Sequence, residues 1–421
     1  MSNNFFANYL SYVGKTESPD IYHRWCMLTG VGSLLGRRCY MKHGHFTVNP
    51  NLYVMLLGRS GVRKSTAIKI WKRLQAKTGY DNFSADKTTK EKWLLDLAGE
   101  ENDVVGGAKT ADTILDSNLW GSDKESVKST EPRECFIVAD EWNDFTSLGN
   151  MEFYSLLGTL WDWGDEPYEN RIKNGKSVLI NKPTISILGG NTPTNFALAF
   201  PPEILGQGFF SRLLLIHSDL IKDKITWPET PTESSTNIQV KDLIHIRTEA
   251  QREIIPDALA VKLLDKIYKT YQPFEDARFD SYCNRRFTQL LKLCVIHAAI
   301  RSSLYISEQD VILSNTILTR AEELMPKALG EFGKGKNSDV ANKVVDILSK
   351  SRLPITMANL WKLVDHDCDK QSSLVEILSN LRAADKIQQV GTGFLVKRKV
   401  SVIVNNDTVD YNLLTKEERG L

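Results

Sequence analysis

The chain lacks the residues and runs that mark secreted, zinc-binding or membrane proteins. Its six cysteines are scattered through 421 residues without a C-x-x-C pair, which argues against zinc and indicates reduced thiols. No apolar run approaches the roughly 18 residues that span a bilayer. The first residues, MSNNFFANYL, lack the charged segment and cleavage site of a signal peptide. We therefore expect a cytoplasmic protein with no membrane partner.

An excess of charge of one sign is also absent. The 53 Lys and Arg residues balance 52 Asp and Glu residues, so the formal net charge is +1. Any contact with nucleic acid must therefore come from local basic patches and not from a global field. The hydrophobic share of 42% is ordinary for a globular protein, and 421 residues are enough for two or three domains.

Composition and hydrophobic spacing divide the chain into five parts. Strands alternate with helical patterns over 51–225, which is typical of an α/β core with a parallel sheet. A stretch rich in Pro, Ser and Thr at 222–240 is typical of a linker. We predict an N-terminal helical segment (1–50), an α/β core (51–225), a linker with a helical lid (226–332), a small C-terminal domain (333–400) and a polar tail (401–421).

The most informative stretch is LYVMLLGRSGVRKST at 52–66. An apolar strand, a glycine-bearing loop and a helical pattern follow one another as in a P-loop, whose backbone N–H groups and helix N-terminus bind phosphate oxygens. Lys64 would reach the β- and γ-phosphates of ATP, and the Ser65 hydroxyl would bind Mg²⁺. Arg63 stands where the general motif G-x-x-x-x-G-K-[ST] has glycine, so a chance match is the alternative. The candidate nucleotide-binding residues are Gly58, Arg59, Ser60, Gly61, Val62, Arg63, Lys64, Ser65 and Thr66.

The next apolar strand, ECFIVADE at 134–141, ends in two acids. Asp140 would hold the magnesium ion through its water shell, and Glu141 would polarise the attacking water. The alternative is a buried strand that simply ends in solvated carboxylates. Because this strand follows a P-loop, we favour the catalytic interpretation.

Two further apolar strands carry one polar residue at an end. TISILGGN at 184–191 ends in Asn191, whose amide could orient the water near the γ-phosphate, although an Asn at a strand end is usually a turn residue. GFFSRLLLI at 208–216 has Arg212 at the start of a strand, where a merely buried arginine would be costly. An arginine finger stabilises transition-state charge and is often supplied by a neighbouring subunit, and we favour it over a partnered core arginine.

A basic hairpin is predicted between these strands, in YENRIKNGKSVLI at 168–180. Asn-Gly between two alternating runs is a strong signal for a two-residue hairpin turn. Arg171, Lys173 and Lys176 surround this turn and could contact a DNA backbone, which is bound through its charge without sequence preference. Lysines at a hairpin tip that are simply solvated are the alternative.

The order of these motifs resembles a known family. It is similar to the AAA+ helicases of the minichromosome maintenance (MCM) type, to superfamily 3 viral helicases and, most closely, to phage and mobile-element replication ATPases with an MCM-like core. Their P-loops have the form G-x-x-G-x-x-K-S, to which GRSGVRKS conforms, although Arg63 is bulkier than the small residue common there. The resemblance covers roughly 50–330 and implies ATP, Mg²⁺ and a hexameric ring with ATP sites between subunits.

The resemblance continues in the expected lid. NRRFTQLLKLCVIHAA at 284–299 is similar to the MCM lid helix, which begins with a sensor arginine. An alignment without gaps puts that sensor at Arg285 and leaves Arg286 as an alternative, with Lys292 and His297 also on family positions. We expect His297 to be a packed helical residue. The first 50 residues do not resemble the large DNA-binding N-terminal domain of MCM proteins.

The C-terminal domain is predicted to be a winged helix. Three helical runs and two short strands over 339–399 are typical of that fold, and 12 Lys and Arg stand against 7 Asp and Glu over 333–399. Winged helices bind duplex DNA in many proteins and mediate protein contacts in many others, so the partner stays open.

Together these features predict an ATP-driven DNA helicase or translocase of phage or mobile-element replication, which acts as a hexameric ring in the cytoplasm of a bacterial host. Its partners would be single-stranded or forked DNA, further copies of the chain and other replication proteins. Arg212 of a neighbour, with Arg285, would stabilise the γ-phosphate. One alternative is an AAA+ DNA-binding initiator or switch that assembles with ATP without unwinding. Another is an ATPase that acts on protein.

Overall fold

The structure of the chain is a computed structural model that divides into two compact units. The first contains Met1–Leu329 and Asp407–Leu421, and the second contains Gly330–Asn406. The residues described are 5–99, 131–146, 148–171, 177–200, Ile204, 208–220, Lys222, 224–273, 276–329, 338–351, 353–367, 370–383, 387–396 and 407–420. Every helix among them is too short or too polar to cross a membrane.

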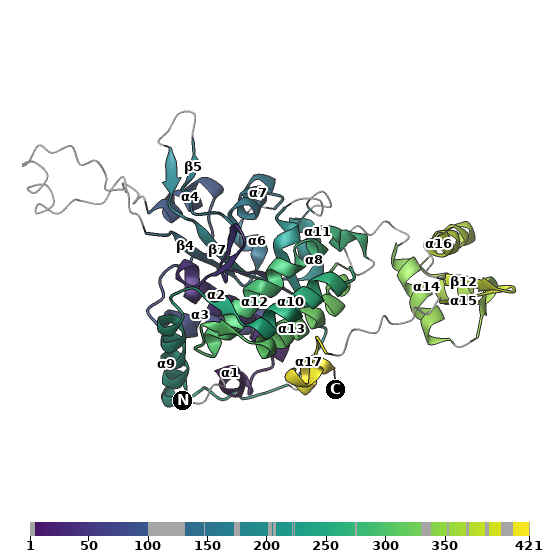
Figure 1. Ribbon diagram of the computed structural model, residues 1–421. Helices are drawn as coiled ribbons and strands as arrows, with labels where there is room; N and C mark the ends of the chain where they lie inside the picture. The colour runs from purple at the N-terminus through teal and green to yellow at the C-terminus, as the bar shows by residue number, and fades with distance from the viewer. Residues whose placement is uncertain are drawn as a thin grey trace, which may run out of the picture. The chain divides into compact units, whose positions relative to one another are not determined.

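A four-stranded parallel sheet lies at the centre of the first unit (Figure 1). Its order is β4 (Glu134–Ala139), β7 (Thr184–Asn191), β3 (Tyr53–Leu57) and β8 (Leu213–His217). All residues of β3, β7 and β8 are buried, as expected of parallel strands covered on both faces. The predicted α/β class with a central parallel sheet is confirmed, and this sheet is compatible with a P-loop-like core.

The pairing of these strands creates two functionally different edges. Leu57 is in register with Asn191 and with His217, so the strands end together at what we call the carboxyl edge. Tyr53 is in register with Leu213, which puts the strand beginnings at the opposite, amino edge. Since β7 lies between β3 and β4, its last residues are flanked by the ends of both.

The N-terminal segment is part of the first unit, and its second helix is buried within that unit. It forms α1 (Phe5–Val13), α2 (Asp20–Leu35), η1 (Gly36–Arg38) and the antiparallel pair β1 (Met41–His43) and β2 (Phe46–Val48). Every residue of α2 after the first is buried, which is the mark of a helix packed on all sides. A Cβ at Gly30 would lie 1.5 Å from Trp71 Nε1, so glycine there lets α2 approach α3 (Lys64–Ala76) closely.

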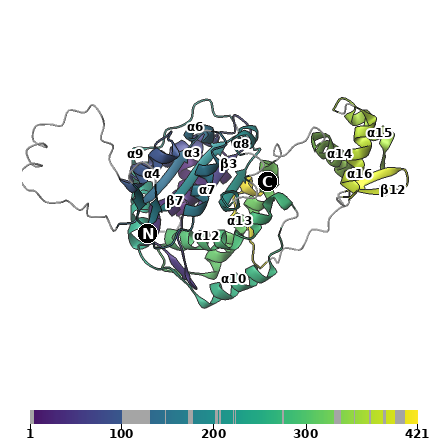
Figure 2. The same cartoon turned by 90° about the horizontal axis from the view of Figure 1, so that it is seen from above.

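Helices and short strands complete the first unit around the sheet. Between the strands lie α4 (Lys90–Ala98), α6 (Trp142–Phe145), α7 (Met151–Leu160), β5 (Tyr168–Asn170), β6 (Val178–Ile180), α8 (Pro193–Ala199) and η3 (Phe210–Arg212). After β8 come α9 (Glu233–Glu249), β9 (Ile255–Pro256), α10 (Ala258–Thr270), η4 (Ala277–Phe279), α11 (Asp280–Cys283), α12 (Arg286–Ile300), β10 (Tyr305–Ile306) and α13 (Glu308–Ala328). Helices α10, α12 and α13 form one group, in which α13 contacts both of the others (Figure 2).

The stretch expected as a linker is partly helical. Helix α9 begins at Glu233, inside the Pro-, Ser- and Thr-rich region, because the Thr232 side chain accepts a hydrogen bond from the Ser235 N–H at 3.2 Å and caps the helix. Serine and threonine favour helix caps as well as loops, so composition alone does not separate the two.

The second unit contains the three helices and the hairpin that the spacing predicts. They are α14 (Ser338–Lys350), β11 (Ile355–Thr356), α15 (Met357–Val364), α16 (Gln371–Ala383), β12 (Ile387–Val390) and β13 (Gly393–Val396). The strands pair antiparallel in the order β11-β13-β12, and the turn between β12 and β13 contains Gly391 at a φ of 61°. A separate apolar core, which includes Val344, Leu360 and Leu378, holds this unit together.

The C-terminal residues return to the first unit. After η5 (Tyr411–Leu413), α17 (Lys416–Arg419) carries Glu418, whose buried carboxylate accepts hydrogen bonds from the Arg24 guanidinium of α2, one of them 2.7 Å long. The Asn315 amide donates to the Thr408 carbonyl oxygen at 2.7 Å. Residues 407–420 therefore differ from the expected polar tail. Glu418 is held in a buried ion pair with Arg24, and composition does not reveal this pairing.

The buried ion pair between Arg24 and Glu418 predicts that removing one partner destabilises the first unit. Glu418→Ala leaves the Arg24 charge buried without its partner, so we expect the free energy of unfolding to fall by about 3 kcal/mol. Urea unfolding followed by tryptophan fluorescence measures the change. Lys416→Ala, at an exposed position in the same helix, should change stability by less than about 0.5 kcal/mol. Equal effects of the two substitutions would show that the pair does not anchor the segment.

Candidate functional site

The predicted strand, loop and helix are present at 53–76, and two glycines shape the loop. A Cβ at Gly58 would lie 2.4 Å from the Tyr22 hydroxyl oxygen and 2.6 Å from the Ser218 carbonyl oxygen, so no larger residue fits there. Gly61 has a φ of +87°, which a side chain would strain. The loop therefore turns sharply from β3 into the N-terminus of α3, where unpaired N–H groups can bind an anion.

Arg63 shows why the general motif has glycine before the lysine. It precedes α3 at a φ of 59° and a ψ of 30°, in the left-handed region that favours glycine. Its Nε donates to Glu17 Oε2 at 2.5 Å, and Glu17 Oε1 accepts from the Ile225 N–H at 2.8 Å. The hydrogen bonds from Ile225 and Arg63 lower the pKa of Glu17. Arg63 thus links the P-loop to the N-terminal segment and to the stretch after β8.

Lys64 lies folded against its own loop. Its Nζ donates to the carbonyl oxygens of Gly58 at 2.8 Å and Arg59 at 3.0 Å, and the side chain is buried. Burial lowers the pKa of Lys64, while the nearby Glu141 carboxylate opposes that shift. The ammonium group is therefore held at the loop, within electrostatic reach of Glu141, one of the two predicted catalytic acids.

The two predicted carboxylates lie at the carboxyl edge, directly after β4. Burial raises the pKa of Glu141; the Lys64 ammonium acts in the opposite direction, and Asp140 and Asp144 add to the rise. Asp140 Oδ2 accepts from Lys69 Nζ of α3 at 2.7 Å. The sheet thus brings Glu141 into electrostatic contact with Lys64, although 77 positions separate them in the sequence.

Asn191 completes this group and is fixed by a residue that the sequence analysis missed. Its Nδ2 donates to Asn143 Oδ1 at 3.0 Å, and its Oδ1 accepts from the Thr192 N–H at 2.9 Å. A Cβ at Gly190 would lie 2.6 Å from the Asp140 carbonyl oxygen, so β7 and the acidic turn pack tightly. Asn143 follows the two acids closely in sequence, but nothing in the sequence pairs it with a strand 48 residues away.

Oxygen donors suited to magnesium are present in this group. Ser65 is the second residue of α3 and Asp140 directly follows β4, and Mg²⁺ prefers one or two such oxygen ligands together with phosphate and water oxygens. Among the described residues no cluster of three His, Cys, Asp or Glu side chains could hold a metal alone. Ser65 and Asp140 could therefore hold a magnesium ion only together with oxygen atoms from a bound ligand or water.

Arg212 lies at the amino edge, where η3 leads into β8. Its Nη1 donates to the Gly208 carbonyl oxygen at 2.6 Å, and its guanidinium carbon is 5.7 Å from the Trp161 ring centroid. Its buried Nε has no hydrogen-bond partner within the described part of the chain. Burial lowers the pKa of Arg212, and the Arg285 charge adds to the effect.

Helix α12 brings the sensor candidate to the same place. Arg285 Nη1 is 3.3 Å from Asp162 Oδ2, and Gln289 Nε2 donates to the Arg212 carbonyl oxygen at 2.9 Å. Arg286, the alternative sensor, is buried and binds Glu322 at 2.8 Å. Arg286 is therefore a structural residue, whereas Arg285 is partly exposed beside Arg212.

Two further residues of α12 are packed in the interior. Lys292 Nζ donates to the Asn49 carbonyl oxygen at 2.9 Å and to Asn51 Oδ1 at 2.6 Å, and it lies 4.4 Å from the Trp161 ring centroid. Burial lowers the pKa of Lys292 to about 7. His297 Nδ1 is hydrogen-bonded to Ser314 Oγ at 2.7 Å, as expected of a packed helical residue.

The candidate residues therefore form two groups and not one. Lys64, Glu141 and Asn191 gather at the carboxyl edge, while Arg212 and Arg285 lie at the amino edge. A strand rises roughly 3.3 Å per residue, so the five residues of β3 separate the edges by roughly 15 Å. Neither arginine can reach the P-loop of its own chain without a large rearrangement of the sheet.

The arms of the predicted hairpin are confirmed. β5 and β6 pair antiparallel, with Tyr168 opposite Ile180 and Asn170 opposite Val178. Arg171 is exposed, and its Nε donates to Glu169 Oε1 at 3.0 Å. Lys173 and Lys176, with the Asn-Gly turn between them, lie outside the described residues.

Because the backbone of Arg63 is left-handed, we expect glycine at this position to give a more stable protein than alanine. Arg63→Gly and Arg63→Ala both lose the contact with Glu17, but only alanine keeps the conformational strain, so the glycine variant should be more stable by about 1 kcal/mol. Chemical denaturation of the purified variants measures this difference. Lys72, in the middle of α3, supplies the control, because there glycine should be less stable than alanine by about 1 kcal/mol. The same order at both positions would contradict the strained geometry.

No protein-family model matches this chain, and a search of curated proteins finds no match to its sequence. The function is therefore inferred from the motifs and from the geometry of the two edges.

Proposed function

We propose that the protein is a P-loop ATPase that binds ATP at the carboxyl edge and hydrolyses it. One observation supports this most strongly: the parallel order β4-β7-β3 brings Glu141, Asn191 and Lys64, from three separate segments, to one edge of the sheet. A chance P-loop match gives no reason for a buried amide and a carboxylate to converge on the loop.

Each residue of this group has a role that its surroundings support. The P-loop N–H groups and Lys64 hold the phosphates, and Lys64 exchanges its bonds to loop carbonyls for bonds to phosphate oxygens. Glu141 accepts a proton from the attacking water, for which its raised pKa improves the match to neutral pH. Asn191, fixed by Asn143, orients that water. Magnesium, held by Ser65 and Asp140, would supply positive charge against the phosphate oxygens.

The amino-edge arginines support an oligomer. Arg212 has a buried Nε without a hydrogen-bond partner among the described residues, lies beside the like charge of Arg285 and is remote from its own P-loop. A phosphate group bound to a neighbouring subunit would relieve the repulsion between the two arginines and accept a hydrogen bond from Arg212 Nε. Arg212 is therefore proposed as an arginine finger acting in trans, with Arg285 as the sensor of the same phosphate, in a homo-oligomeric ring. By the motif resemblance, the ring is an AAA+ hexamer.

The proposed work of this ring is helicase or translocase activity on DNA in phage or mobile-element replication. Support comes from the motif order, from the hairpin before β7 and from the second unit, whose three helices and antiparallel β11-β13-β12 sheet agree with a winged helix. The hairpin would grip single-stranded or forked DNA. The alternative is an AAA+ initiator or switch that assembles with ATP without unwinding.

The ATPase proposal is tested with one variant from each side of the site. Lys64→Ala and Glu141→Gln should each lower ATP hydrolysis at least 100-fold, because the first removes phosphate binding and the second removes the general base. Phosphate release is measured with and without a forked DNA duplex, and strand displacement is followed in the same reactions. Full activity in either variant contradicts the mechanism, whereas wild-type hydrolysis without displacement favours the initiator or switch.

The trans arrangement predicts that two inactive variants rescue each other. Arg212→Ala keeps an intact P-loop and Glu141→Gln keeps an intact finger, so mixed rings contain some complete sites. Mixing them before assembly should restore a measurable part of the wild-type ATPase rate. The control mixes Arg212→Ala with the double variant Arg212→Ala/Glu141→Gln, which supplies no finger and should restore nothing. Failure of the first mixture to gain activity would show that Arg212 does not act across a subunit boundary.

A further inference from the structure

A short turn follows α7 next to the amino edge of the sheet. It contains residues 161–164, and we call it the α7 turn. Its first residue, Trp161, is 1% exposed, whereas the side chain of its second residue, Asp162, is 36% exposed. The turn therefore combines a buried aromatic ring with a carboxylate that other groups can reach from the surface.

Polar side chains from two distant segments bind the backbone of the α7 turn. Asn51 Nδ2, just before β3, donates to the carbonyl oxygens of Trp161 and Ile185, both at 2.8 Å. Arg37 Nη2, in η1, donates to the Trp163 carbonyl oxygen at 3.0 Å. These bonds join the turn to the start of the sheet and to the end of the N-terminal helices.

Lys292 of α12 adds a charged group to this anchoring. Its Nζ donates to Asn51 Oδ1 at 2.6 Å and lies 4.4 Å from the Trp161 ring centroid, where the face of the ring attracts a cation. The Asn51 amide thus binds the lysine with its oxygen and the turn with its nitrogen. Lys292 therefore connects α12 to the turn through one amide and one aromatic ring.

The α7 turn also contacts both arginines of the amino edge. The guanidinium carbon of Arg212 lies 5.7 Å from the Trp161 ring centroid, and Asp162 Oδ2 lies 3.3 Å from Arg285 Nη1. Burial lowers the pKa of Arg212, and the Asp162 carboxylate opposes that lowering. The turn thus presents an aromatic face and a negative charge to two guanidinium groups that repel each other.

We propose that the α7 turn positions Arg212 and Arg285 for a phosphate group bound to the neighbouring subunit, an inference that rests on the proposed ATPase function. Trp161 and Asp162 are positioning residues that contact the arginines, and Lys292 acts through them because it fixes the turn. Two guanidinium groups can meet one phosphate only if their repulsion is offset before it arrives.

The exposure of the ion pair supports this role. The side chains of Asp162 and Arg285 are both partly exposed, so water can solvate the carboxylate when Arg285 exchanges it for a phosphate oxygen. The exchange therefore leaves no charge buried without a partner, which is the costly outcome for an ion pair in the interior.

The first experiment removes the charge of the turn and keeps its shape. Asp162→Asn leaves the repulsion between the two arginines without compensation, so kcat for ATP hydrolysis should fall at least tenfold. KM for ATP should stay within twofold of wild type, because the P-loop lies at the other edge. Steady-state phosphate release measures both constants. An unchanged kcat, or a change in KM alone, overturns the positioning role.

The second experiment asks on which side of the subunit boundary the turn acts. Asp162→Asn and Lys292→Met should each impair the amino edge, so each should exceed the mean of the separate rates when mixed before assembly with Glu141→Gln. Mixed with Arg212→Ala, neither should exceed that mean, because both partners then lack the same half of the site. A residue needed only for folding does not show this difference between the two mixtures.

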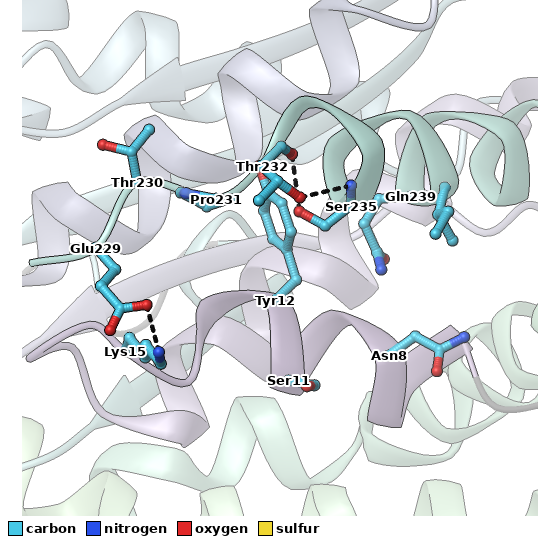
Figure 3. Close-up of a pocket in the computed structure, with 11 residues that line it drawn as sticks. Asn8, Ser11, Tyr12, Lys15, Glu229, Thr230, Pro231, Thr232, Ser235 and Gln239 are labelled. Carbon is cyan, nitrogen blue, oxygen red and sulfur yellow. Dashed lines mark hydrogen bonds and ion pairs between the residues drawn. The ribbon is translucent and has the colours of Figure 1, made fainter.

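Two matched controls accompany these variants. Asp265→Asn removes a carboxylate that pairs with Lys269 at the surface of α10. Gln239→Met replaces another buried polar side chain by methionine, at a position of α9 where the side chain points toward α1 (Figure 3). Both controls should keep the kcat and KM of the wild type.

The outcomes separate this inference from the proposed function. If Arg212→Ala and Glu141→Gln rescue each other but Asp162→Asn and Glu141→Gln do not, the α7 turn has no positioning role and the proposed function stands. A gain in the mixture of Asp162→Asn with Arg212→Ala overturns the inference in the same way. Absence of ATP hydrolysis by the wild-type protein overturns the proposed function and this inference with it.

Discussion

The parallel pairing of β7 with both β3 and β4 is the constraint on which the candidate site depends. Parallel strands end at one edge, so the P-loop after β3, the acids after β4 and Asn191 at the end of β7 are brought together by backbone hydrogen bonds alone. A shift of β7 by one residue would turn Asn191 to the other face of the sheet. Gly190 and Asn143 maintain this arrangement, the first by admitting the Asp140 carbonyl and the second by orienting the amide.

The same sheet separates the cationic residues from the phosphate-binding loop. Arg212 begins β8 and Lys64 follows β3, and because the two strands run parallel in register, these residues lie at opposite edges. Asp162 balances Arg285 in part, whereas Arg212 keeps a buried donor without a partner among the described residues. The two edges of one chain therefore differ: the loop before α3 lies at one edge, and the guanidinium groups of Arg212 and Arg285, which Asp162 compensates in part, lie at the other. In the proposed head-to-tail ring, these two edges would meet at a subunit boundary.

Local chemistry made much of the site predictable, and long-range packing limited the rest. The glycines, Lys64 and the paired acids stand in short motifs whose spacing is set by the P-loop turn and the strand end. The sequence left the choice between Arg285 and Arg286 open, because two adjacent arginines at the start of a helix look alike in sequence although their burial differs. Only the buried pairing of Arg286 with Glu322 identifies Arg286 as the structural residue. Residues 407–420 had too few apolar positions to indicate packing, since Glu418 is anchored by charge against Arg24.

The α/β class could be predicted from the sequence, as could the strand–loop–helix at 53–76, the hairpin arms and the elements of the second unit, because each depends on contacts between near neighbours. Long-range packing alone buries α2 on all sides, pairs Arg63 with Glu17 and returns the C-terminal residues to α2. These features join residues tens to hundreds of positions apart. Hydrophobic spacing indicates which face of a single helix or strand is buried. It does not indicate which charged residue from a distant part of the chain will pair with a residue of that element.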